Sequence, residues 1–473
     1  MKISFIIFLF LFILLFCLET DFNIVYNSNY EGSQFINLIN NVFLEVNISF
    51  GSHEDTFKAE LDLESYCITI PGIELENENI KKFNKSLSTT FKEKEKLNFI
   101  FLEKFFSGLI GEDTIKLGNS RSIKNIRFVI AYEYSYSFQN SFSYIGLGLS
   151  TNQINLAGIN ILEQLKNNSI IDKQLWYLEF EDYNKGKFVL GKYPHEINTN
   201  YKEKDKYQTY LQKTNLDSYR IKFDEIYYGY LNNYENRIVM QEHKETVILL
   251  STRLIYSTYE YGESIYNKFF RKKIEEKKCF IGKISEDSEY SCFYCQKNIN
   301  INEMENLNFY IRDTNMTFTF TPKDLFYEHN DYFYYLVVYK QFNIDDSDKD
   351  TEWKLGLQFL QKYVLTFDRN DRIVYYYSKN DFDDDGGNNN KDDDGNNNKD
   401  DDKKDGEKSK DNNSTYIIII VLLIVIFICS IAFLVLYIKK IKPRKVKANE
   451  LDEGYDYETK KESENGKDNF LIN

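Results

Sequence analysis

The sequence predicts a mostly β fold followed by one membrane-spanning helix. Tyr and Phe each contribute 38 of the 473 residues, and both favour strands. Many short runs rich in Tyr, Phe, Ile and Thr alternate in polarity or end at Gly, Asn or Asp, as strands do. These runs cover residues 42–50, 56–70, 126–132, 176–180, 187–190, 219–228, 309–320, 332–339 and 363–367. Helical spacing of apolar residues is clear over residues 159–167 and 263–276.

The N-terminus resembles a secretory signal peptide. Lys2 is followed by an apolar run over residues 3–18 that is interrupted only by Ser4. A short basic region before such a run is typical of a signal peptide, and the run is short for a spanning helix. We therefore expect a signal peptide over residues 1–19, with an uncleaved anchor as the alternative.

A second apolar run, residues 416–438, lies near the C-terminus and has no polar face. A helix of this length crosses a hydrocarbon core of about 30 Å. Lys and Arg cluster directly after it, over residues 439–447, and such clusters mark the cytoplasmic side. The sequence therefore predicts a single-pass protein with residues 439–473 in the cytosol and its larger part outside, at the cell surface or in a secretory organelle.

The formal charge of −14 argues against a nucleic-acid partner. Much of the acidic excess lies in residues 380–415, where a KDDDGNNN pattern repeats. This segment has almost no apolar side chains to bury, so we expect a disordered stalk between the folded part and the membrane.

Four cysteines fall in the predicted extracellular part, namely Cys67, Cys279, Cys292 and Cys295. An even set in an oxidising compartment suggests disulfides, and four cysteines allow three pairings. The CxxC of Cys292 and Cys295 is also found in zinc sites, but no second CxxC accompanies it. We expect neither a metal nor another cofactor.

Four Asn-x-Ser/Thr sequons in the part predicted to be folded are candidate glycosylation sites. They are Asn47, Asn84, Asn167 and Asn315.

Several segments, in this order, resemble the pepsin-like aspartic proteases. Residues 42–57 are similar to the first hairpin of that family, and residues 59–71, AELDLESYCITIP, to its first catalytic strand and loop. Residues 107–117, SGLIGEDTIKL, resemble the segment after the family's flap. The most specific match is WKLGLQFLQKYVLTFDRNDRIVYY, residues 353–376, which resembles the family's closing run. A C-terminal anchor is also found in membrane-bound members, including one branch of the plasmepsins.

The resemblance implies a bilobal double β-barrel with a peptide-binding cleft between the lobes. We expect the first lobe within residues 20–200 and the second within residues 201–379. It also implies one disulfide in the second lobe, joining Cys279 to Cys292 or Cys295, with Cys67 paired to the remaining cysteine or free.

Catalysis in this family requires two aspartates that share one proton across the cleft. Asp62 stands at the first position, but Leu63 and Glu64 replace the Thr and Gly that normally follow. Counting along the second lobe places Leu250 at the second position, and residues 246–259 contain no Asp or Glu. Phe101 falls at the position of the flap tyrosine.

These departures predict a protein that has kept the fold and lost catalysis. We expect it to bind a peptide or protein in or near the cleft, in adhesion or recognition. The alternatives are an active membrane-anchored aspartic endopeptidase with a non-standard dyad, and a structural organiser of a secretory organelle.

Overall fold

The computed structural model describes residues 17–26, 35–75, 80–101, 104–134, 143–149, 159–212, 218–229, 238–285, 288–341 and 352–377. All of these residues belong to one compact unit. Most of the predicted signal peptide and all of the predicted stalk, span and tail lie outside the described residues. Within the described ranges no helix is both long and apolar enough to cross a membrane.

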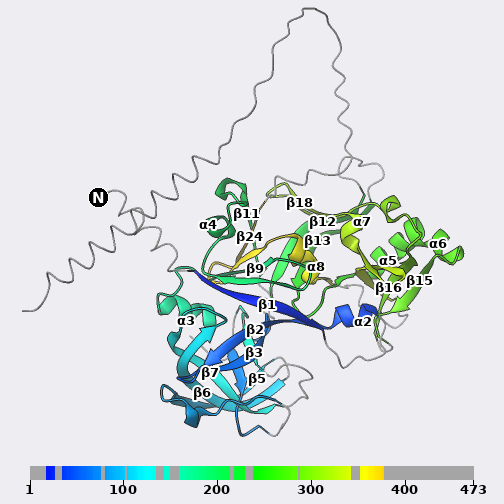
Figure 1. Ribbon diagram of the computed structural model, residues 1–473. Coiled ribbons are helices and arrows are strands. Elements are labelled where there is room, and N and C mark those ends of the chain that lie inside the picture. The colour runs from blue at the N-terminus through cyan, green and yellow to red at the C-terminus, as the bar shows by residue number, and fades with distance from the viewer. Residues whose placement is uncertain are drawn as a thin grey trace, which may run out of the picture. The chain divides into compact units, whose positions relative to one another are not determined.

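The first sheet has thirteen strands among the described residues, in the order β11-β24-β23-β9-β10-β1-β2-β3-β8-β4-β7-β6-β5. Nine of them, β1, β2, β3, β5, β6, β7, β9, β11 and β24, are labelled in Figure 1. An additional pairing of β2 with β6 closes the strands from β2 to β6 in this order into a barrel. The strands are β1 Leu18–Tyr26, β2 Val42–Phe50, β3 Asp55–Asp62, β4 Ile68–Pro71, β5 Lys92–Phe101, β6 Lys104–Leu117, β7 Ile123–Tyr134, β8 Tyr144–Gly146, β9 Leu175–Phe180, β10 Lys185–Leu190, β11 Lys206–Tyr210, β23 Thr366–Asp368 and β24 Ile373–Tyr377.

The second sheet has eleven strands in the described part of the chain, in the order β18-β17-β12-β13-β22-β14-β21-β16-β20-β19, with β15 paired to β16. They are β12 Arg220–Tyr228, β13 Ile238–Ile248, β14 Ile255–Ser257, β15 Cys279–Lys283, β16 Tyr290–Gln296, β17 Leu307–Ile311, β18 Met316–Phe320, β19 Phe326–His329, β20 Tyr332–Tyr335, β21 Val337–Lys340 and β22 Trp353–Leu355.

The helices in the described part of the chain are short. The α-helices are α2 Phe35–Asn40, α3 Ile161–Asn167, α4 Pro194–Ile197, α5 Tyr259–Ile265, α6 Arg271–Glu275, α7 Pro322–Leu325 and α8 Leu357–Lys362. A π-helix, η5 Tyr266–Phe270, joins α5 to α6, and the 3-10 helices are η2 Lys85–Leu87, η4 Glu203–Asp205 and η6 Ile301–Glu303. Both predicted helical segments are confirmed: α3 lies within residues 159–167, and α5, η5 and α6 cover most of residues 263–276.

The prediction of a mostly β fold is confirmed, and the strand predicted over residues 42–50 has the observed bounds. Strand β1 was not predicted, and its first two residues overlap the expected signal peptide. Leu18, Thr20, Phe22 and Ile24 alternate inward from this strand, and β1 pairs with both β2 and β10. This strand was missed because its first two residues had been assigned to the signal peptide.

The sheets do not follow the expected lobe boundary at residues 200 and 201. Strands β11, β23 and β24 lie within the residues expected to form the second lobe, yet they extend the first sheet: β23 pairs with β9, and β11 pairs with β24. The lobe bounds remain a prediction. The sharing of the first sheet was not predicted, because an alternating sequence specifies which face of a strand is buried but does not specify its partner. Trp176 and Phe367, stacked at a ring distance of 4.4 Å, lie in the core at this junction.

The second sheet contains the disulfide Cys279–Cys295, which joins directly opposite residues of β15 and β16. This is one of the two pairings expected from the resemblance. Cys292 and Cys67 are buried free thiols, and burial raises the pKa of the Cys67 thiol to about 11. Cys292 and Cys295 are three residues apart in one strand, so they point to opposite faces of it. Because Cys295 is disulfide-bonded, Cys292 is the one free thiol of the CxxC.

Replacing Cys279 and Cys295 together by Ala should lower the free energy of unfolding by about 3 kcal/mol, because the crosslink closes a loop with a sequence separation of 16. Urea unfolding of the full chain measures this loss. The matched control is Cys292→Ala, which removes a buried thiol without opening a loop. Peptide mapping without reductant should recover the 279–295 link, and recovery of a 279–292 link would contradict this assignment.

Candidate active site

In the first lobe, the candidate site is a loop between two neighbouring strands. Strand β3 ends at Asp62, the loop covers residues 63–67, and β4 begins at Ile68. The short strand β8 lies between them and pairs in parallel with β3 and antiparallel with β4. A Cβ atom on Gly146, at the end of β8, would lie 2.5 Å from the Ser65 carbonyl oxygen, so the loop crosses β8 at a point where only glycine fits.

The Asp62 carboxylate is bound by its own loop. Its Oδ1 accepts from the Glu64 N–H at 2.9 Å, and its Oδ2 accepts from the Ser65 N–H at 3.1 Å and from the Ser65 hydroxyl. Asp62 is half-buried. An aspartate that accepts bonds from the next two or three residues stabilises a tight turn. The described contacts therefore give Asp62 a structural role in shaping the loop.

The second lobe repeats this arrangement. Strand β13 ends at Ile248, β14 begins at Ile255, and the short strand β22 pairs in parallel with β13 and antiparallel with β14. Gly356 follows β22, and its N–H donates to the Leu254 carbonyl at 3.1 Å. A Cβ atom on Gly356 would lie 2.4 Å from that same oxygen, so glycine is required here as it is at Gly146.

Strand pairing shows which residue of the second loop corresponds to Asp62. Ile145 of β8 pairs with both Leu61 and Ile68, and Leu355 of β22 pairs with both Ile248 and Ile255. Both intervals are seven residues long, since 68 minus 61 and 255 minus 248 are both 7. The residue after Leu61 is Asp62, and the residue after Ile248 is Leu249.

The predicted second position, Leu250, is therefore one residue too far along the chain. Burial agrees with the corrected register: Asp62 and Leu249 are both partly exposed, whereas Leu63 and Leu250 are 9% and 5% exposed. Leu250 was chosen by counting residues along the chain from the start of the second lobe. The position that corresponds to Asp62 is instead determined by the pairing of β13 and β14 with β22. Leucine occupies either position, so the second loop presents no carboxylate.

Glu245 is the acidic residue that precedes this loop most closely. It lies within β13 opposite Lys222, four residues before Leu249. Four residues of extended strand span about 13 Å, so Glu245 cannot supply a carboxylate at the position of Leu249.

Comparison with known families supports what this geometry indicates. The family model of eukaryotic aspartyl proteases matches residues 45–376, which is well over half of the chain. The chain belongs to the eukaryotic aspartyl protease family. Comparison with curated proteins gives no match.

In this aspartyl protease domain, Phe101 lies at the end of β5, next to the tip of the β5–β6 hairpin. Its backbone pairs with Lys104 across the hairpin. The hairpin predicted from the position of the flap is thus present, and residues 102–103 at its tip lie outside the described residues.

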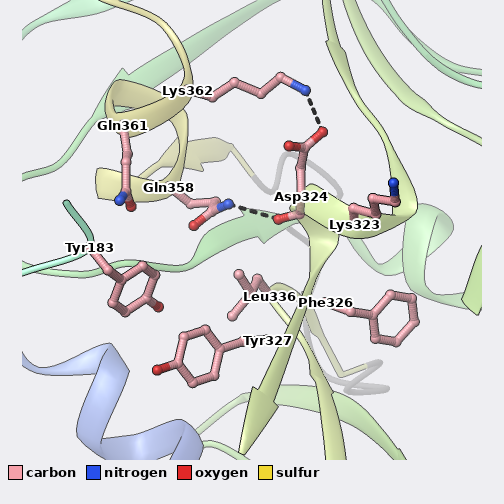
Figure 2. Close-up of a pocket in the computed structure, with 9 residues that line it drawn as sticks. All are labelled: Tyr183, Lys323, Asp324, Phe326, Tyr327, Leu336, Gln358, Gln361 and Lys362. Atoms are coloured by element: carbon pink, nitrogen blue, oxygen red, sulfur yellow. Dashed lines mark hydrogen bonds and ion pairs between the residues drawn. The ribbon is translucent and has the colours of Figure 1, made fainter. Parts of the chain in front are cut away.

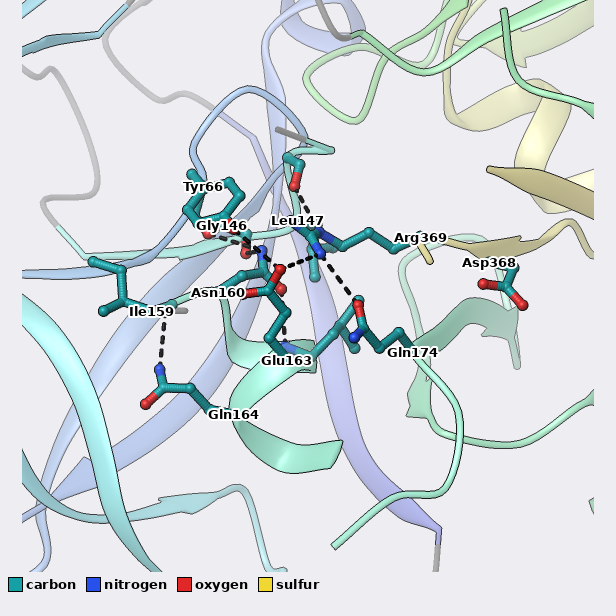
Figure 3. A network of polar contacts seen from close by, with 12 residues as sticks. Tyr66, Gly146, Leu147, Ile159, Asn160, Glu163, Gln164, Gln174, Asp368 and Arg369 are labelled. Atoms are coloured by element: carbon teal, nitrogen blue, oxygen red, sulfur yellow. Dashed lines mark hydrogen bonds and ion pairs between the residues drawn. The ribbon is translucent and has the colours of Figure 1, made fainter. Parts of the chain in front are cut away.

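A buried polar network supports the first loop of the aspartyl protease domain (Figure 3). Arg369, between β23 and β24, forms an ion pair with Glu163 at 2.9 Å and donates to the Gly148 carbonyl at 3.1 Å and to Gln174 at 3.1 Å. Its guanidinium carbon lies 5.0 Å from the Tyr66 ring, and the Tyr66 hydroxyl donates to Glu163 at 3.2 Å. Sequence reasoning missed this network because its members come from distant segments.

The second loop is supported by Arg253, which is fully buried. Register places Arg253 at the position of Tyr66. Its guanidinium carbon lies 3.5 Å from the Tyr183 ring, and Nη2 donates to the Tyr183 carbonyl and to Asn184 Oδ1 at 3.1 Å. Each loop is thus fixed by an Arg–Tyr contact, with the two residue types exchanged between the lobes.

The four predicted glycosylation asparagines lie in accessible backbone positions. Asn47, Asn167 and Asn315 are exposed, and Asn84 is half-buried at the N-cap of η2, where it accepts from the Ser86 N–H at 3.1 Å. Their modification remains a prediction. Within the described ranges, no group of three or more His, Cys, Asp or Glu side chains is arranged to hold a metal ion.

The corrected register predicts opposite outcomes for two neighbouring substitutions. Leu250→Asp places a carboxylate in a buried site, so it should lower the free energy of unfolding at pH 7 by at least about 2 kcal/mol more than Leu249→Asp does. The excess should shrink as the pH falls, because burial raises the pKa of the new carboxyl and protonation removes its charge. Urea unfolding of both variants measures the difference, and equal losses would contradict the register.

Asp62→Ala should lower the free energy of unfolding by about 1–2 kcal/mol, because it removes the acceptor of three hydrogen bonds within the loop. Asp62→Asn should lose less, since one amide oxygen remains as an acceptor. Asp21→Ala is the matched control, since Asp21 is an exposed residue of β1. A neutral Asp62→Ala variant would show that the loop does not depend on this carboxylate.

Proposed function

We propose that this chain is a membrane-anchored member of the aspartyl protease family that binds a peptide or protein without hydrolysing it. The observation that carries the proposal is Leu249 at the register position of Asp62. The reaction needs one carboxylate to take a proton from water and a second, protonated one to polarise the scissile carbonyl. A leucine side chain supplies neither.

Energetic reasoning supports the loss of hydrolysis. General acid and base groups each contribute factors of about 10² to 10⁴ in rate, and the two members of a coupled pair act as one unit. Glu64 does not compensate, because it lies two residues from Asp62 in the same loop and not across the cleft. The three hydrogen bonds that hold Asp62 to its loop are consistent with a structural role.

The retained architecture supports a binding role. Both loops, both central strands and the β5–β6 hairpin are present although the second carboxylate is missing. Proteins of this fold bind extended peptides through backbone hydrogen bonds and side-chain pockets, and neither requires a catalytic dyad. We propose that the ligand lies in or near the cleft between the lobes.

The placement at a membrane is supported by the sequence and by one structural feature. The apolar run at residues 416–438 and the basic residues after it favour an anchor with the folded part outside the cytosol. The disulfide Cys279–Cys295 fits an oxidising compartment. The cell surface and a secretory organelle both meet this requirement.

The second candidate function is hydrolysis by a non-standard dyad, and the retention of Asp62 in a family of proteases favours it. The two functions differ in what Asp62 does. In a protease its removal abolishes cleavage, whereas in a binding protein its removal affects only the stability of the loop.

The purified full-length chain in mild detergent should leave a broad peptide library uncut between about pH 3 and pH 7, where carboxylate dyads work. An inhibitor with a central hydroxyl of the pepstatin type should bind weakly, because that hydroxyl is bound by two carboxylates. Mass spectrometry of the library and calorimetry with the inhibitor measure these outcomes, with an active aspartic protease as positive control. Cleavage that disappears in Asp62→Asn would overturn the proposal and restore the enzyme.

A further inference from the structure

A short helix from the N-terminal part of the chain packs against the second loop, residues 249–254. Helix α2 lies between β1 and β2 in the sequence, and both of these strands belong to the first sheet, yet α2 lies beside elements of the second sheet (Figure 1). Its Ile36 and Ile39 are fully buried in one apolar cluster with residues of the second lobe. These residues are Leu254, Ile284, Cys292, Leu336 and Val338.

Aromatic rings of the second lobe hold the first residue of α2. Phe35 stacks on His329 at a ring distance of 4.0 Å and on Tyr327 at 5.1 Å. Tyr327 also lines the pocket drawn in Figure 2, which shows it beside the blue ribbon of α2. The side chains of α2 therefore attach the helix to the second lobe from its first turn onward.

The last turn of α2 is also bonded to the backbone of the second loop. The Arg253 N–H donates to the Ile39 carbonyl at 3.0 Å, and the Val42 N–H, at the start of β2, donates to the Ser251 carbonyl at 3.1 Å. One donor and one acceptor of the loop backbone are thus satisfied by the segment that joins α2 to β2.

Asn40 adds side-chain bonds to the same contact. Its Oδ1 accepts from the Thr252 hydroxyl at 3.2 Å and from the Tyr256 hydroxyl. The Thr252 hydroxyl oxygen in turn accepts from the Leu254 N–H at 3.0 Å, within the loop. The contact between α2 and the loop is therefore polar as well as apolar.

The Ser251 carbonyl and the Arg253 N–H are a pair of groups that an extended peptide can bind. In a parallel β pair, one residue of the added strand donates its N–H to residue i−1 and accepts through its carbonyl from residue i+1. A single ligand residue opposite Thr252 would therefore use both groups. Val42 and Ile39 now occupy them, while the Thr252 and Arg253 carbonyls accept from the first two N–H groups of α8, at 2.8 and 3.3 Å.

We propose that α2 is a built-in competitor for these backbone groups, and that a peptide pairs with the second loop only after α2 is displaced. This inference rests on the binding role proposed above and concerns its regulation. A helix of six residues is not stable by itself, so the position of α2 depends on its contacts with the second lobe. The apparent affinity for a peptide is then lowered by the fraction of molecules in which α2 is in place.

The first test uses the full-length chain in mild detergent and a fluorescent pool of random octapeptides, with binding measured by anisotropy. Ile39→Ala removes a fully buried side chain that holds α2, so the pool should bind at least about tenfold more tightly than to the wild type. Asn40→Ala, which removes no buried apolar side chain, should act in the same direction. The matched control is Leu165→Ala, an equally buried residue of α3, which should leave the affinity unchanged.

A crosslink tests the opposite change. Asn40→Cys together with Thr252→Cys replaces two side chains that are in contact, so that a disulfide can hold α2 in place. The crosslinked protein should bind the pool at least about tenfold more weakly than the same protein after mild reduction. Wild type treated with the same reductant controls for opening of Cys279–Cys295. Equal or tighter binding by the crosslinked protein would show that α2 only supports the loop.

Amide hydrogen exchange locates the bound peptide. With peptide bound to the wild type, the Val42 N–H should lose protection because the peptide takes the Ser251 carbonyl, whereas the Arg253 N–H should stay protected by the peptide carbonyl. Binding that leaves Val42 protected would place the peptide elsewhere and overturn the proposal.

The outcomes separate this inference from the binding role on which it rests. Equal affinity of the wild type, Ile39→Ala and Asn40→Ala would overturn the inference and leave the binding role intact. Absence of binding by every variant at millimolar peptide would overturn both. Cleavage of the pool by Ile39→Ala that disappears when Asp62→Asn is added would also overturn both, because the protein would then be an enzyme restrained by α2.

Discussion

The structure depends on one constraint that occurs in both lobes. In each lobe a short central strand pairs in parallel with the strand that leads into the loop of Asp62 or Leu249. β8 pairs with β3 and β22 pairs with β13. β8 ends at Gly146 and β22 is followed directly by Gly356, and each glycine lets the loop cross in close contact. This pairing sets the register of both loops at once. The identity of the residue opposite Asp62 in the second lobe therefore follows from ladders of hydrogen bonds, and the side chains of the loop itself do not decide it.

The two loops are continuous with one hydrophobic core although their polar chemistry differs. Leu63 and Leu250, the residues that follow Asp62 and Leu249, are buried and belong to the same apolar cluster. In the family, hydroxyl side chains at these positions hydrogen-bond across the dyad. Apolar packing at these two positions keeps both loops folded without such hydrogen bonds.

Much of the fold was accessible from the sequence, because strand and helix periodicities are local properties. The strand at 42–50 and the helix within 159–167 were predicted in this way, whereas Asp62 was singled out by the resemblance of residues 59–71 to a catalytic strand and loop. What failed was decided by contacts between distant residues. Leu249 could not be told from Leu250 without β22, and the addition of β23 and β24 to the first sheet has no local signal. The partner of Cys279 is decided by the register of β15 against β16, which places Cys295 directly opposite Cys279.

The contacts that support the two loops could not be predicted from the sequence either, because they join distant residues. These contacts differ between the two lobes. Around the first loop, Arg369 is neutralised by Glu163 and bonded to Gly148 and Gln174. Around the second loop, Arg253 is bonded only to neutral groups among the described residues, and its Nε has no partner. A fully buried guanidinium without a carboxylate is costly, and cation–π contact with Tyr183 and Tyr26 offsets only part of that cost. Natural folds tolerate such local deficits mainly where a site uses them. The two arginines therefore hold the two loops by different means: Arg369 acts through an ion pair, and Arg253 acts through hydrogen bonds to neutral groups and contact with aromatic rings.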